Sequence, residues 1–105
     1  MKIDDNTWNN TACRLTLLTT TNKLAWYRFA YGQKYWAEYG KIRIEIEQLT
    51  SDNIVLRIKG KDMSTYKADT EAIDALMVSV KKQHNIDEES DIRDFINELL
   101  NEEIK

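Results

Sequence analysis

The sequence predicts an α+β domain in which a four-stranded antiparallel meander sheet has its helices packed on one face, in the order α-β-β-β-β-α-α. Within residues 41–59, apolar and polar residues alternate strictly in two stretches, which is typical of half-buried strands. Two aromatic-rich runs lie within residues 24–39, and amphipathic stretches of helical period flank the strands on both sides. A sheet with one apolar face has to bury that face, and these helices are the available cover.

The length and composition indicate a single α+β domain, residues 1–105, with one core. Hydrophobic residues make up 42% of the chain and charged residues 31%, which fits a folded globular protein rather than a disordered one. No apolar run approaches the ~20 residues of a membrane span, and the acidic start lacks the apolar region of a signal peptide. A lone cysteine, Cys13, cannot form an internal disulfide. These features predict a cytoplasmic protein without membrane contact.

Charge is unevenly distributed along the chain. Residues 1–67 carry 11 basic and 7 acidic residues, whereas residues 68–105 carry 4 basic and 11 acidic ones, for a net charge of −3 overall. A dedicated duplex DNA-binding protein needs a concentrated basic surface, so this distribution argues against that class.

Residues 5–20 are predicted to form the first helix. Capping residues are available at positions 4–7, and a stripe then recurs at helical spacing through Trp8, Thr11, Ala12, Leu15 and Leu18. The threonines at 19–21 have poor helix propensity and should end the helix. The threonine-rich residues 15–21 are also compatible with an extended segment.

The four strands follow in sequence. Residues 24–31 and 35–39 form the first hairpin around Gly32, and Gly40 permits a tight reversal into the next strand. The alternating runs on either side of the polar break at 50–53 then form a second antiparallel hairpin with one isoleucine-rich face. On its other face, Glu45 and Glu47 are expected to pair with Arg57 and Lys59 across the strands.

The C-terminal third is predicted to hold a loop and two helices. Residues 60–68 are polar and indicate a connecting loop, and residues 70–84 carry a helical stripe of Ile73, Leu76, Met77 and Val80. Residues 85–87 interrupt that pattern. A third helix then occupies residues 88–103 of the acidic segment 88–105, with a narrow stripe of Ile92, Phe95, Ile96, Leu99 and Leu100. Such a helix packs either on its own core or in a partner's groove.

Seven of the ten aromatic residues lie between positions 26 and 39, and strand alternation must send some of them to each sheet face. If helices cover one face, rings on the other face form a candidate binding surface beside several cations. Its expected members are Trp26, Tyr27, Arg28, Tyr35, Trp36 and Tyr39. Such a surface fits a protein interface, in which Trp, Tyr and Arg are common anchors, or stacking of single-stranded nucleic acid. The alternative is that these rings complete the core and its cross-strand pairs.

The acidic third helix is a second candidate site, with Asp91, Asp94 and Glu98 as its expected contact residues. A row of carboxylates can recruit a basic partner or imitate a phosphate backbone. Acidic helix faces also occur simply as solvated surface.

The sequence offers little for catalysis. Cys13 and His84 are the only residues of their types and lie on different predicted helices, with Cys13 expected as a small buried residue. Glycine-rich phosphate loops, serine-nucleophile elbows and zinc-ligand spacings are absent from the sequence, so we expect no cofactor and no metal. The predicted function is a non-enzymatic interaction or regulatory module that binds a protein partner or a second copy of itself. The alternative function is binding of single-stranded nucleic acid through the aromatic strands.

Parts of the chain resemble small, mostly uncharacterised proteins of low-GC Gram-positive bacteria and their phages. In that pattern a short helix leads into a Lys-Leu-x-Trp strand, an aromatic hairpin and an Ile-x-Ile strand, matched here by residues 23–26, 35–39 and 42–44. The resemblance implies an accessory or regulatory protein carried by a phage or another mobile element. It implies no catalytic residue.

Overall fold

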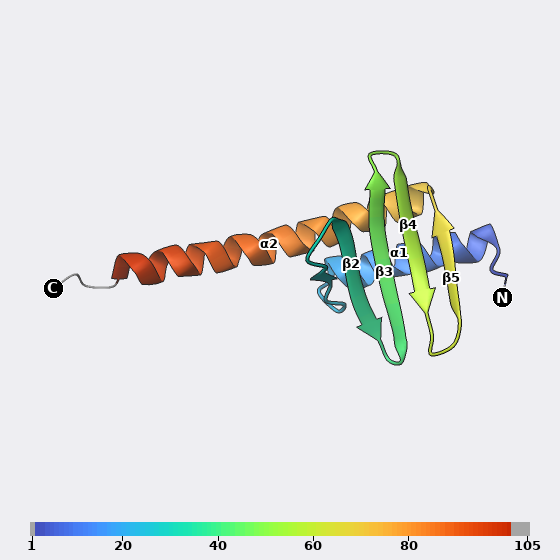
Figure 1. The fold of residues 1–105 in the computed structure, drawn as a ribbon, viewed down its shortest axis with the longest axis horizontal. Coiled ribbons are helices and arrows are strands. Elements are labelled where there is room, and N and C mark those ends of the chain that lie inside the picture. Colours follow the sequence, from blue (N-terminus) through green and yellow to red (C-terminus); the bar gives the residue numbers. More distant parts are fainter. Residues whose placement is uncertain (1, 102–105) are drawn as a thin grey trace.

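The chain folds into a five-stranded antiparallel sheet with one helix before it and one helix after it (Figure 1). The structure, a computed structural model, describes residues 2–101, apart from the side chains of residues 86–88. The elements are α1 (Asp5–Thr20), β1 (Tyr27–Arg28), β2 (Gln33–Tyr39), β3 (Ile42–Thr50), β4 (Asn53–Lys59), β5 (Ser64–Ala68) and α2 (Glu71–Asn101). The α+β class and the antiparallel sheet are confirmed.

The sheet is a meander in the order β1-β2-β3-β4-β5, because each strand pairs with the strand that follows it through a short turn. The predicted β3–β4 hairpin is present, with Ile44 opposite Ile58 and Ile46 opposite Leu56. Alternation therefore collects the isoleucines on one side, the inner face, and the charged residues on the other side, the outer face.

The prediction of four strands is wrong by one, because residues 64–68 form β5 rather than a loop. This strand is polar, but Thr65 and Tyr66 have high β-propensity and β4 offers it a free edge. Short polar edge strands of this kind are common ends of a sheet, and their polarity hides them in the sequence. At the other edge, only Tyr27 and Arg28 of the predicted strand 24–31 pair with β2.

A single helix of 31 residues, α2, replaces the two predicted C-terminal helices. The predicted break at 85–87 is wrong, because residues 71–101 contain neither proline nor glycine and three ordinary polar-apolar residues do not end a helix. At 1.5 Å per residue α2 is about 46 Å long, which makes the molecule elongated at 65 × 29 × 26 Å. The predicted helical residues 102 and 103 lie outside the described residues.

Both helices lie on the inner face of the sheet, as Figure 1 shows, in agreement with the prediction. Helix α1 begins where the side chain of Asp4 accepts a hydrogen bond from the Thr7 amide at 2.7 Å. Its apolar stripe and the first half of α2 pack against the inner face of the sheet. The core consists of Trp8, Ala12, Leu15, Leu24, Trp26, Tyr35, Ala37, Ile44, Ile46, Ile54, Leu56, Ile73, Leu76, Met77 and Val80.

The segment between α1 and β1 is fixed to α2 by one side chain, that of Gln83. Its amide nitrogen donates to the backbone oxygens of Thr19 and Leu24, at 3.2 and 2.8 Å, and its oxygen accepts from the Trp26 amide at 3.0 Å. Backbone groups of this connection are thus bonded to a side chain that lies 57 to 64 residues away in the sequence.

Candidate protein-interaction surfaces

The outer face of the sheet carries aromatic rings and cations that are engaged with one another. The ring centroids of Tyr27 and Trp36 lie 4.7 Å apart, and the Arg43 guanidinium lies 4.5 Å from the centroid of Trp36. The Lys34 ammonium lies 4.6 Å from the ring centroid of Phe29. These are cation–π distances, so part of the ring surface that could stack a ligand is already used within the protein.

Glu45 is the centre of a charge cluster on this face and is only 3% exposed. Its carboxylate lies 3.1 Å from the Lys59 ammonium, 3.1 Å from the Arg43 side chain and 3.4 Å from the Lys34 ammonium. Burial by itself raises the pKa of Glu45, but the bonds and attraction from Lys59 and Lys34 outweigh it and hold the pKa below its ordinary value. The cross-strand pairing predicted for Glu45 and Glu47 is confirmed, since Glu47 pairs with Arg57 at 2.8 Å.

The structure divides the predicted aromatic surface between the two faces. Trp26 and Tyr35 are 5% and 2% exposed and belong to the core, so their placement on an open face is wrong. Tyr27 and Trp36 do lie on the outer face, where they pair in register. Neighbouring strand residues point to opposite sides, so Trp26 and Tyr27, and likewise Tyr35 and Trp36, cannot share one surface.

Arg28 and Tyr39, the remaining members of that set, lie at the margins of the inner face. Arg28 pairs in register with Tyr35, and one of its terminal nitrogens donates to the Gly32 carbonyl at 3.4 Å. Tyr39 is exposed at the end of β2, beside the turn into β3. Neither side chain joins the Tyr27–Trp36 pair.

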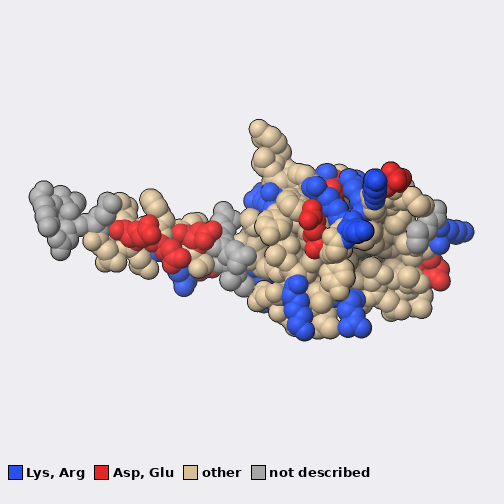
Figure 2. All heavy atoms as spheres, turned by 90° about the horizontal axis from the view of Figure 1, so that it is seen from below, with Lys and Arg blue, Asp and Glu red and all other residues tan. Residues whose placement is uncertain are grey.

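The second half of α2 projects beyond the domain, and residues 85–101 are called the α2 extension below. Every residue from 89 to 101 is exposed, including Asp91, Asp94 and Glu98. Its large apolar side chains are exposed as well, by 45 to 76%: Ile92, Phe95, Ile96, Leu99 and Leu100. Their spacing of i, i+3, i+4, i+7 and i+8 places them on one stripe of the helix. Figure 2 shows mostly acidic side chains along this projection, and mostly basic ones with some acidic ones among them over the rest of the molecule.

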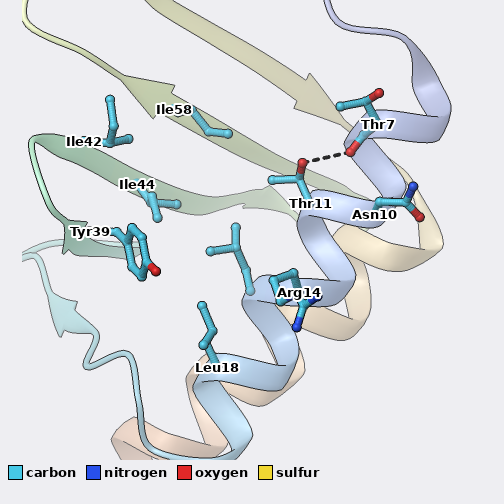
Figure 3. Close-up of a pocket in the computed structure, with 10 residues that line it drawn as sticks. Thr7, Asn10, Thr11, Arg14, Leu18, Tyr39, Ile42, Ile44 and Ile58 are labelled. Atoms are coloured by element: carbon cyan, nitrogen blue, oxygen red, sulfur yellow. Dashed lines mark hydrogen bonds between the residues drawn. The ribbon is translucent and has the colours of Figure 1, made fainter.

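A feature that the sequence analysis did not predict is an apolar groove at one end of the inner face, between α1 and the strands. Its cavity has a volume of about 650 Å³, and Figure 3 shows Leu18 of α1 facing Ile44 and Tyr39 of the sheet across the opening. The lining residues are Thr7, Asn10, Thr11, Arg14, Leu15, Leu18, Tyr39, Ile42, Ile44 and Ile58. A second apolar cavity of about 220 Å³ shares Ile42 and Ile58 with it. The two together are called the inner groove.

Cys13 and His84, the two residues considered for catalysis, lie on different helices and in different environments. Cys13 is exposed on α1, so its expected burial is wrong, and it lines a polar depression with Lys67 and Thr70. His84 packs edge-on against Tyr35, with ring centroids 5.6 Å apart. Among the described residues, no group of three or more His, Cys, Asp or Glu side chains is arranged to hold a metal ion. Neither helix within residues 2–101 has the length and apolarity of a membrane span.

Comparison with known proteins gives no match: no family model, no curated protein and no solved structure matches this chain. The resemblance to small proteins of Gram-positive bacteria and their phages therefore stays a prediction.

Proposed function

We propose that this protein is a small non-enzymatic interaction module that binds a protein partner through the α2 extension. The observation that carries the proposal is the exposed stripe of Ile92, Phe95, Ile96, Leu99 and Leu100 on a helix that leaves the domain. Soluble proteins rarely leave contiguous apolar surface in water unless it serves an interface. An amphipathic helix with anchors at i, i+3, i+4 and i+7 is a common ligand for an apolar groove.

The charges of the extension specify the partner further. Residues 85–101 contain six acidic residues and one basic residue, Arg93, which pairs with Glu89 on the same helix at 2.7 Å. A partner surface that accepts this helix is apolar at its centre and basic at its rim. The same negative charge repels nucleic acid, so the extension is a protein ligand.

The experiment compares capture of partners from a lysate by three forms of the protein. Phe95→Ser removes the central ring of the stripe, and Val78→Ser makes a matched change at an exposed apolar position of α2 outside the extension. Partners of the extension bind the wild type and the Val78→Ser variant and are lost with Phe95→Ser. Partners retained equally by both variants would show that the extension is not the binding element.

A second candidate function is binding of single-stranded nucleic acid at the outer face, where Tyr27 and Trp36 lie among the cations Lys34 and Arg43. Tyr27 is 53% exposed, and within residues 2–101 both helices lie on the opposite face. In this case oligonucleotide binding falls steeply with added salt and is lost in Tyr27→Ala, while Tyr31→Ala, at an exposed tyrosine outside the pair, retains it. Absence of binding at low salt would remove this candidate.

A further inference from the structure

We infer that the partner of the α2 extension is a second copy of this chain, whose inner groove receives the apolar stripe. This inference rests on the proposed function and names the partner. Each copy supplies one extension and one groove, so two copies related by a twofold axis make two identical contacts and the assembly closes as a dimer.

The inner groove is a part of the inner face that neither helix covers and on which a further helix could pack. Helices α1 and α2 cover part of the sheet, and the strand ends that carry Tyr39, Ile42 and Ile58 extend past α1 (Figures 1 and 3). The inner-face positions of β4 are apolar along its whole length, and those of β3 are apolar from Ile42 to Ile46, with the polar Gln48 at the far end. The two helices do not cover this surface completely, because Ile42 is 38% exposed and Ile58 is half-buried. A third helix laid against this end would bury the remaining apolar surface.

The α2 extension has the properties of that missing helix. Its stripe is apolar and its flanks are acidic, whereas Arg14 is the charged residue on the wall of the larger cavity. The domain that carries the groove is basic on balance, with 11 basic and 8 acidic residues in positions 1–70. Pairing of two extensions with each other would instead bring six acidic residues of one helix against six of the other. Charge therefore favours the groove over a second extension.

A chain does not fill its own groove in this structure. Helix α2 is continuous through residue 101 and carries the extension away from the sheet, so residues 89–101 stay exposed (Figure 1). In domain-swapped dimers, a segment extends from its own domain and packs against the domain of the other copy. The α2 extension and the uncovered inner groove have this relation.

The test is the mass of the full chain in solution, measured by sedimentation for the wild type and for variants whose fold is checked by circular dichroism. The wild type is a dimer. Phe95→Asp on the extension gives a monomer, and so do Ile42→Asp and Arg14→Glu at the groove. Both copies carry the substitution, so it disrupts both extension–groove contacts of the dimer. Val78→Asp, which introduces the same charge on α2 outside the extension, remains a dimer. Arg14 is exposed, so its variant reports on the groove even if Ile42→Asp fails to fold.

Mixing the monomeric variants gives the sharpest result. The Phe95→Asp chain keeps an intact groove and the Ile42→Asp or Arg14→Glu chain keeps an intact extension, so the mixture regains one contact and forms a heterodimer. A dimer that Phe95→Asp abolishes but both groove variants keep would mean that extensions pair with each other, and the inference would be wrong. A monomeric wild type would also overturn it. In that case capture of another protein that depends on Phe95 would still support the proposed function.

Discussion

The indole N–H of Trp26 donates a hydrogen bond to the hydroxyl of Thr19 at 2.9 Å, and both residues are buried. The Thr19 hydroxyl in turn donates to the Leu15 carbonyl at 2.7 Å. This chain of bonds ties the segment before β1 to the end of α1. It explains why Trp26 belongs to the core although the neighbouring Tyr27 faces outward.

Replacement of Thr19 by Val should therefore destabilise the fold, because the buried Trp26 N–H loses its acceptor. The expected loss in the free energy of unfolding is about 1–3 kcal/mol. Urea denaturation measures it, with Thr20→Val as the matched control, since the Thr20 hydroxyl bonds only to the exposed turn of α1. Equal effects of the two substitutions would contradict the role assigned to the Trp26–Thr19 bond.

Replacement of Gln83 should lower the free energy of unfolding by as much as many substitutions in the core do. Gln83→Ala removes the side-chain partner of the Leu24 carbonyl and of the Trp26 amide, and one of the two donors to the Thr19 carbonyl, at a cost of about 1–3 kcal/mol. The control is Gln33→Ala, at an exposed position of β2, which should change the free energy of unfolding little. A Gln83→Ala protein with wild-type stability would show that water replaces these bonds without loss.

Glu45 should make stability depend on pH. Its folded-state pKa lies below the ordinary value of 4.5, so its stabilising contribution is complete above pH 4.5 and is lost as the pH falls through the lowered folded pKa. Glu45→Gln should cost about 1–2 kcal/mol at neutral pH, because the cations around it are partly exposed and regain water. The difference between wild type and variant should shrink in acid. A difference that is constant from pH 7 to pH 3 would contradict this assignment, and Glu38→Gln is the exposed control.

Ile44→Asp should unfold the domain, because it places a carboxylate at a position that is buried among the inner-face residues of the sheet. The same substitution at Glu38, an exposed position of the neighbouring strand β2, should leave the domain folded because Glu38 already carries a carboxylate in water. Circular dichroism and thermal melting distinguish the two variants. An Ile44→Asp protein with an unchanged melting temperature would contradict the register of β3.

Local sequence patterns correctly predicted the elements that have one face on the core and the other in solvent. The alternation through β3 and β4 gave the hairpin and the inner face, and the stripe from Trp8 to Leu18 gave α1. Strand β5 was missed because Ser64–Ala68 is polar, and its pairing with β4 is a tertiary contact. The helical pattern of α2 weakens at residues 85–87, but a weak pattern does not break a helix that lacks proline and glycine.

The candidate site was harder to predict than the fold. The acidic residues Asp91, Asp94 and Glu98 were identified because they belong to one helix and need no knowledge of the rest of the molecule. Alternation predicts that neighbouring rings of the aromatic set point to opposite sides, but it does not say which side the helices cover, so the predicted set combined members of both faces. The inner groove exists because α1 and α2 cover only part of the sheet. How much of the sheet they cover is set by tertiary packing, which cannot be read from a local sequence pattern.

Amide hydrogen exchange of the full chain, measured at increasing protein concentration, tests most directly whether the α2 extension is a binding element rather than part of its own domain. The amides of residues 89–101 should exchange rapidly in dilute solution and become protected as the concentration rises, while those of β3 stay protected throughout. Protection of residues 89–101 that is the same at every concentration would contradict association of the extension with a second copy.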